Sequence, residues 1–175
     1  MKLVLATQNP KKLKEMNEIL SHLGVEVVSE AELGVRIEVE ETGETFTDNA
    51  RLKATAVMQA TGLPAVADDS GLCVDALNGG PGVYSARFGG EGLDDKGRYT
   101  LLLEMLRGQT DRAAHFHTSI VCAFPNGDEL VCEGECPGTI AFAPMGEGGF
   151  GYDPVFFVPE LRKTCLLYTS PSPRD

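Results

Sequence analysis

With 175 residues and a mass of 18.7 kDa, the chain is long enough for one domain that buries about two thirds of its unfolded surface. Its formal net charge of −11 argues against duplex nucleic acid as a partner, because proteins that bind duplexes usually carry a basic face. The chain shows neither a secretory signal nor an apolar run long enough to span a bilayer, so we expect a cytoplasmic protein with no membrane partner.

Residues 2–24 predict a strand, a loop and a helix. Residues 2–6 form a short apolar run of strand type. Asn9 is a good helix N-cap and Pro10 suits the first helical position. Apolar side chains then follow at helical spacing before Gly24 ends the helix: Leu13, Met16, Leu20 and Leu23.

Two lysines stand at the start of this helix, where the macrodipole disfavours cations. Lys11 and Lys12 would be explained by an anion such as phosphate, held by the lysines together with free backbone N–H groups. A solvated basic turn explains them about equally well. The Walker pattern is absent, so this segment is not a P-loop.

A second helix is predicted to follow an acidic segment. Thr45 with Asp48 resembles a capping box, and an apolar face follows at Phe46, Ala50, Ala54 and Val57, with Lys53 on a different face. The acidic residues before it are Glu38, Glu40, Glu41 and Glu44. A solvated loop accounts for most of these residues. Glu40 is a functional candidate only as a metal ligand together with Asp68 and Asp69.

The strand-like run at residues 65–67 ends in Asp68, Asp69, Ser70 and Gly71. Two adjacent carboxylates at the end of a buried strand repel each other and are costly to desolvate. A magnesium ion would remove both costs, because it takes one or two carboxylates together with substrate phosphates. A polar turn in which an aspartate caps the next element is the alternative.

The rest of the chain completes a mixed α/β pattern. A glycine-rich loop at residues 78–93 precedes a predicted helix at about 93–106. Strands are predicted at 113–124 and 129–134, joined by a hairpin turn at Asn126-Gly127. The five cysteines include Cys132 and Cys136, but no second pair completes a zinc site, so we expect buried, reduced thiols.

Glycines flank Phe150 in residues 147–154, where they would let the backbone approach a flat ligand. Phe150 and Tyr152 could stack on a nucleobase, and Asp153 could accept hydrogen bonds from base N–H groups. A glycine-rich turn leading into the apolar strand at 155–158 is the alternative.

Taken together, these segments resemble the inosine/xanthosine triphosphate pyrophosphatase family, whose members remove deaminated purine nucleotides. The resemblance runs in the family's order and spacing from residue 1 to about residue 164. It covers residues 7–12, 40–43, 46–50, 53–54, 67–72, 81–87 and 148–154.

The resemblance implies magnesium-dependent hydrolysis of a purine nucleoside triphosphate such as ITP, dITP or XTP to the monophosphate and pyrophosphate. It implies that Asp69 is the general base and a metal ligand, that Glu40 is the other usual ligand and that Asp68 is a further one. It implies that the phosphates are bound by Thr7, Gln8, Asn9, Pro10, Lys11, Lys12, Lys53 and Ser70. Arg87 would contact a phosphate or stabilise its own loop. For the nucleoside it implies Phe150, Gly151, Tyr152 and Asp153.

The same resemblance implies an α/β fold: one domain with a long curved mixed sheet flanked by helices, two lobes with the active cleft between them, and a homodimer. Family members continue past residue 164 into a helix with a Ser-His-Arg motif that contacts the base. Here residues 165–175 are instead rich in Ser, Thr and Pro. We expect residues 1–164 to form the pyrophosphatase domain without that helix, and residues 165–175 to be a non-native or disordered tail; a genuine divergent tail is the alternative.

None of the three histidines, His22, His115 and His117, stands where the base-reading histidine should be. We therefore expect weakened discrimination between hypoxanthine and adenine. Two other functions stay open: a Maf-type nucleotide pyrophosphatase, whose motifs match less well, and a non-catalytic nucleotide-binding module.

Overall fold

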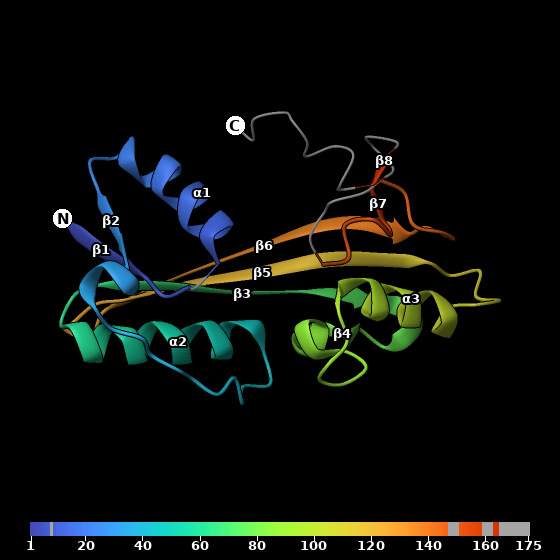
Figure 1. Ribbon diagram of the computed structural model, residues 1–175, viewed down its shortest axis with the longest axis horizontal. Coiled ribbons are helices and arrows are strands. Elements are labelled where there is room, and N and C mark those ends of the chain that lie inside the picture. The colour runs from blue at the N-terminus through green and yellow to red at the C-terminus, as the bar shows by residue number, and fades with distance from the viewer. Residues whose placement is uncertain (8, 147–150, 159–162, 165–175) are drawn as a thin grey trace. The chain divides into compact units, whose positions relative to one another are not determined.

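The computed structural model describes residues 1–7, 9–146, 151–158 and 163–164 (Figure 1). The elements in chain order are β1 (Lys2–Leu5), α1 (Pro10–Ser21), β2 (Glu26–Ser29), α2 (Phe46–Thr61), β3 (Ala65–Val74), β4 (Gly80–Pro81), α3 (Asp95–Met105), β5 (Ala113–Ala123), β6 (Glu129–Ile140), β7 (Phe156–Val158) and β8 (Lys163–Thr164). Short 3₁₀ turns lie at Ala31–Leu33, Asp75–Leu77 and Gly82–Arg87.

The strands form one mixed eight-stranded sheet in the order β2-β1-β3-β5-β6-β7-β8, with β4 beside β3. β1 pairs in parallel with β2 and β3, whereas β4, β7 and β8 pair antiparallel with their neighbours. The expectation of an α/β fold around a mixed sheet flanked by helices is confirmed. In the described part of the chain no helix is long and apolar enough to cross a membrane.

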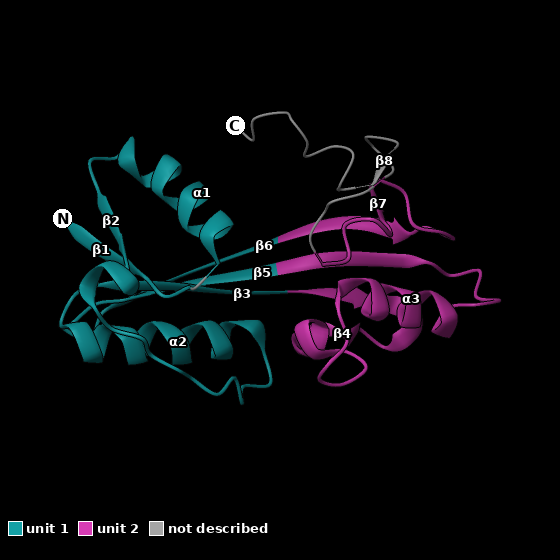
Figure 2. Cartoon of the chain, viewed as in Figure 1, with its two compact units in different colours: residues 1–70, 118–134 teal, residues 71–117, 135–175 magenta. Residues whose placement is uncertain are grey.

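The chain divides into two compact units (Figure 2). Unit 1 holds residues 1–70 and 118–134, and unit 2 holds residues 71–117 and 135–175. The strands β3, β5 and β6 each contribute residues to both units.

In unit 1, α1 begins as its sequence predicts. The Asn9 side chain accepts from the backbone N–H of Lys11, and Pro10 is the first helical residue. One face of the helix packs on a small cluster formed by Leu3, Leu5, Val27 and Val66. The helix ends at Ser21, so Leu23 lies beyond it and is 72% exposed, contrary to the apolar spacing that placed it on the same face.

The helix α2 supplies the main core of unit 1. Its N-cap is Thr45, whose side chain accepts from the backbone N–H of Asp48, as predicted. Ala50, Ala54 and Val57 are buried against the sheet. Because these side chains are small, the helix axis can lie close to the strands.

The strand β3 does not end at its two aspartates, as the sequence suggested, but continues to Val74. The residues after Ser70 are again apolar, and Leu72 and Val74 are fully buried in the core of unit 2. The continuing hydrogen-bonded strand therefore places Asp68 and Asp69 in mid-strand.

The core of unit 2 is built from β3, α3, β5, β6 and β7, and its largest buried side chains are Leu72, Leu102, Leu106, Ile140 and Phe156. The guanidinium of Arg112 donates to the backbone carbonyls of Leu106, Ile140 and Ala141.

The hairpin between β5 and β6 is confirmed, with Gly127 at φ +94° in the turn, but β6 runs to Ile140 rather than 134. Cys132 and Cys136 on β6 are exposed, so the expectation of buried thiols is wrong for these two.

Candidate functional site

Asp69 is a buried carboxylate of unit 1 whose position is fixed by a hydrogen-bonded side chain. It lies on β3 with 9% of its surface exposed. The side-chain amide of Asn49, a fully buried residue of α2, donates to Asp69 Oδ2 at 3.2 Å. The amide oxygen of Asn49 in turn accepts from the backbone N–H of Gly43 at 2.7 Å. A loop, a helix and a strand are thus joined through one side chain that fixes the Asp69 carboxylate.

The surroundings of Gly43 leave no room for a side chain. A Cβ at this position would lie 2.6 Å from Asp48 Cβ and 2.7 Å from Asn49 Oδ1. Both contacts are shorter than van der Waals separation, so any larger residue would displace Asn49 or the loop. Gly43, the glycine of the Glu-Glu-Thr-Gly segment, therefore leaves the space in which Asn49 can hold the Asp69 carboxylate in place.

The charges around Asp69 make its ionised form costly. The pKa of Asp69 is raised from 3.8 to about 6, mainly by burial and then by the charges of Glu41 and Asp68, while Lys53 and the Asn49 hydrogen bond act in the opposite direction. A carboxyl group with this balance is a candidate functional group, because structural aspartates usually keep a low pKa.

Glu41, and not its neighbour Glu40, is the glutamate that the structure brings toward Asp69. Glu41 is half-buried and pairs with Lys53 of α2, with 3.4 Å between Nζ and Oε1, whereas Glu40 is exposed. The role of Glu40 as a metal ligand stays a prediction. The sequence alone could not separate two adjacent glutamates, because only the path of the backbone decides which one faces the helix.

The two aspartates of β3 lie on opposite faces of the strand. Lys12, in the first turn of α1, forms an ion pair with Asp68 at 2.8 Å, while Asp69 is held by α2. Successive strand side chains alternate between faces, and Figure 1 shows α1 and α2 on opposite sides of the sheet. Ser70, exposed and 3.0 Å from Thr118 Oγ1, alternates back to the Asp68 face.

A cavity of about 480 Å³ in unit 1 brings together two of the predicted site residues, Thr7 and Lys53. Its lining includes Thr7, Lys53 and Glu41, and also Glu30 and Arg36, which the sequence did not single out. A second hollow of about 370 Å³ shares Thr7, Glu30 and Arg36 with it and is also lined by Asn9 and Pro10. Lys11 is exposed, and Gln8 lies outside the described residues.

Unit 2 holds the residues that the sequence assigned to the nucleoside. Tyr152 is 6% exposed and its hydroxyl donates to the Ser85 carbonyl at 2.7 Å, which favours a packing role for the ring. Burial raises the pKa of Tyr152 to about 12. The Gly151 N–H donates to Asp95, Asp153 is half-buried, and the exposed Arg87 lies over the Tyr84 ring. Phe150 lies outside the described residues.

Comparison with known proteins identifies the family. The Ham1 family model matches residues 3–169, and the chain therefore belongs to the Ham1 family. It is 51% identical over 165 residues to the dITP/XTP pyrophosphatase of an Exiguobacterium species, covering 94% of this chain and 84% of the relative.

Two further comparisons agree. The dITP/XTP pyrophosphatase of Desulforamulus reducens is 54% identical over 166 residues, covering 94% of this chain and 83% of the relative. The solved structure of a HAM1 protein from Coxiella burnetii superposes with a TM-score of 0.89 at 44% identity, covering 95% of this chain and 86% of that one. The resemblance inferred from the sequence motifs is confirmed.

Proposed function

We propose that this protein hydrolyses non-standard purine nucleoside triphosphates, such as dITP, ITP and XTP, to the nucleoside monophosphate and pyrophosphate. The observation that carries the proposal is the setting of Asp69, a buried carboxylate positioned by Asn49 whose pKa is raised to about 6. The dITP/XTP pyrophosphatases that share half of its sequence support this activity over a Maf-type enzyme or a non-catalytic module.

In the proposed reaction Asp69 accepts a proton from the attacking water. The water oxygen forms a bond to the α-phosphorus, the bond from that phosphorus to the α,β-bridging oxygen breaks, and pyrophosphate leaves with the electron pair. A base with a pKa of about 6 is mostly ionised at neutral pH and still basic enough to take the proton. Asn49 holds the carboxylate in one orientation and leaves the second oxygen, Oδ1, for the water.

Two lysines of unit 1 carry the positive charge that a bound triphosphate requires. Lys53 lines the larger cavity, and Lys12 stands in the first turn of α1, where backbone N–H groups also favour anions. Phosphoryl transfer depends on positioning and charge neutralisation more than on covalent help from the protein. These lysines would bind and orient the phosphate chain for in-line attack.

We also propose that the activity requires magnesium. The carboxylates of Asp69 and Glu41 offer the hard oxygen ligands that magnesium prefers, and the negative charge that raises the pKa of Asp69 is what a divalent cation would offset. When bound, magnesium supplies charge neutralisation at the phosphate oxygens. Asp68, paired with Lys12 on the other strand face, and the exposed Glu40 are the other ligand candidates.

Two glutamine variants separate the candidate glutamates. Glu41→Gln should raise the magnesium concentration needed for half-maximal rate, whereas Glu40→Gln should leave it unchanged. The opposite result would return the ligand role to Glu40, as the sequence motif implied.

A homodimer and a cytoplasmic location complete the proposal. Large apolar side chains exposed on the single chain, Phe142 at 81% among them, are consistent with a covered surface in a dimer. Light scattering after gel filtration measures the mass of the assembly. A nucleotide-pool substrate favours the cytoplasm, and cell fractionation tests this.

The decisive experiment is product analysis with magnesium, with ITP and ATP offered in parallel. We expect pyrophosphate and IMP from ITP, with only weakened discrimination against ATP, because none of the three histidines stands where the base-reading histidine should be. Asp69→Asn should lower the rate by about 10²–10⁴-fold, as expected for loss of a general base, while Asp128→Asn in the exposed hairpin turn should leave it unchanged. Nucleotide binding without turnover in the folded wild type would favour the binding-module alternative.

A further inference from the structure

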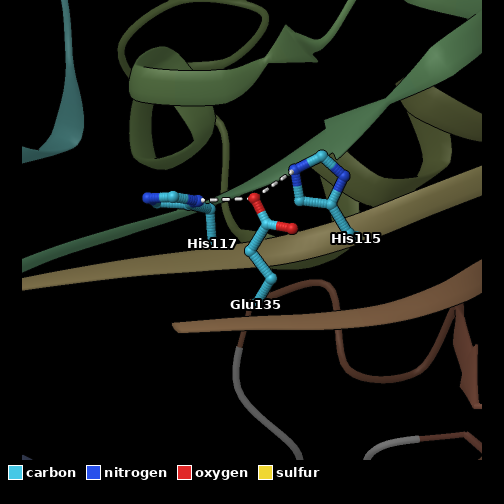
Figure 3. Close-up of side chains that lie close together, drawn as sticks. All are labelled: His115, His117 and Glu135. Carbon is cyan, nitrogen blue, oxygen red and sulfur yellow. Dashed lines mark hydrogen bonds and ion pairs between the residues drawn. The ribbon is translucent and has the colours of Figure 1, made fainter. Parts of the chain in front are cut away.

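Two histidines and a glutamate meet on neighbouring strands of unit 2 (Figure 3). His115 and His117 lie on β5, two residues apart, so their side chains leave the same face of the strand. Glu135 comes from β6, the next strand in the sheet. Figure 3 shows both imidazole rings turned toward one carboxylate oxygen.

The distances suit a shared ion. His117 Nδ1 lies 3.2 Å and His115 Nε2 lies 3.8 Å from the same atom, Glu135 Oε1. One ligand atom from each of the three residues lies within 4.8 Å of the others. Ligands about 2.1 Å from a tetrahedral zinc ion are separated by about 3.4 Å, so small rotations of the partly buried imidazoles and the exposed Glu135 side chain would complete the geometry.

We propose that His115, His117 and Glu135 form a binding site for a divalent transition-metal ion of the zinc type. Imidazole nitrogens select zinc, copper, nickel or iron over magnesium, which prefers oxygen ligands. The site therefore differs in donor chemistry from the carboxylates around Asp69. Three protein ligands leave at least one position for water.

The alternative to a metal site is a simple ion pair, which would need only one histidine. Here two rings converge on one carboxylate whose side chain is 60% exposed, so an ion can reach the donors from solvent. Cys73 also lies near Glu135, since burial and then the charge of Glu135 raise the pKa of its thiol, but its sulfur is not among the donor atoms that lie within 4.8 Å of one another. Cys132 and Cys136 have the opposite parity to Glu135 on β6 and so leave the other face of the strand.

Binding of Zn²⁺ alone to the full chain, followed by calorimetry, tests the proposal. We expect one equivalent to bind to the wild type. Loss of an outer-shell partner already costs about 10–100-fold in metal affinity, so His117→Ala and the nearly isosteric Glu135→Gln should each weaken binding by at least about 100-fold. His22→Ala, at the exposed end of α1, is the matched control and should bind as the wild type does.

Two more variants identify the ligands and keep the test independent of the proposed activity. The double variant Cys132→Ser/Cys136→Ser and the variant Asp69→Asn should both retain the zinc equivalent. Co²⁺ in place of Zn²⁺ should give a visible spectrum without thiolate charge-transfer bands. Unchanged binding in a folded His115→Ala/His117→Ala protein, or loss of binding in the cysteine variant, would overturn the proposal.

Discussion

At the level of single residues, Asp69 carries a cost of ionisation that the fold creates. Its pKa is 3.8 in an unperturbed aspartate and about 6 in the folded protein. Between these pH values the folded state binds a proton that the unfolded state has released, so the free energy of unfolding falls as pH rises through this window. Above this window, ionisation of Asp69 lowers the free energy of unfolding by at most about 3 kcal/mol, at about 1.4 kcal/mol per pKa unit.

Asp69→Asn should therefore stabilise the protein while it removes the proposed general base. We expect the free energy of unfolding to rise by up to about 3 kcal/mol at neutral pH and by almost nothing near pH 4, because the carboxyl is then neutral in the folded state. Urea unfolding at both pH values measures this. Asp128→Asn serves as control, and a loss of stability in the Asp69→Asn variant at neutral pH would contradict the explanation.

Gly43 offers a second test at this scale, because its role is to leave space for Asn49. Gly43→Ala should displace the Asn49 amide and lower kcat by at least about tenfold, since misplacement of a catalytic group by about 1 Å costs about 100-fold. Steady-state kinetics measure the effect.

The matched control for Gly43→Ala is Gly134→Ala on β6, where a Cβ would meet no atom within 4 Å and no positive φ is required. Equal loss of activity in both variants would show that Gly43 has no special relation to Asp69.

At the level of elements, the helix N-termini and the lengths of β1, β5 and β7 were predictable, whereas the lengths of β3 and β6 were not. Asn9 and Thr45 cap their helices through bonds to residues two or three positions away, so the local sequence contains the whole signal. The extension of β3 through Asp68 and Asp69 depends on partner strands that are distant in sequence. Which helix meets each aspartate, α1 for Asp68 and α2 for Asp69, also depends on contacts between segments that are distant in sequence.

The site was predictable in part for the same reason. The sequence placed Asp69 at a strand and Lys12 at the start of a helix, and the structure has them on β3 and α1. The choice of Glu41 over Glu40 as the neighbour of Asp69, the supporting bond from Asn49, and the meeting of His115 with Glu135 all arise from contacts between separate elements. No spacing along the chain encodes such contacts.

The close packing of α2 on the sheet gives a prediction for this element. Ala54 is fully buried, so Ala54→Leu should overpack the core and destabilise the protein by about 1–3 kcal/mol. Ala60→Leu, the same change at an exposed position of the same helix, should cost less than about 0.5 kcal/mol. Thermal unfolding compares the two, and similar losses would show that α2 is loosely packed at Ala54.

At the level of the whole molecule, a net charge of −11 makes the folded chain repel itself. Raising NaCl to an ionic strength of about 0.15 M should therefore raise the melting temperature by screening. MgCl₂ at the same ionic strength should raise it further in the wild type, because an ion that binds only the folded state adds its binding free energy to stability.

Asp69→Asn separates the two contributions. In this variant MgCl₂ should act no more strongly than NaCl, since the site-specific part is lost while the net charge changes by a single unit. Differential scanning fluorimetry with both salts measures the comparison. An equal extra effect of magnesium in both proteins would place its binding away from Asp69.

The ion pair between Lys12 and Asp68 also has a consequence for the order of events during substrate binding. In the free protein the lysine already has an anionic partner, so under the proposed function an incoming phosphate would exchange with Asp68 rather than fill an empty position. A triphosphate without a bound metal ion would leave the Asp68 carboxylate without a counter-charge. If magnesium is the cofactor as proposed, a metal-bound triphosphate would bring a phosphate for Lys12 and a cation for Asp68, so the exchange would favour the metal–nucleotide complex over the free nucleotide.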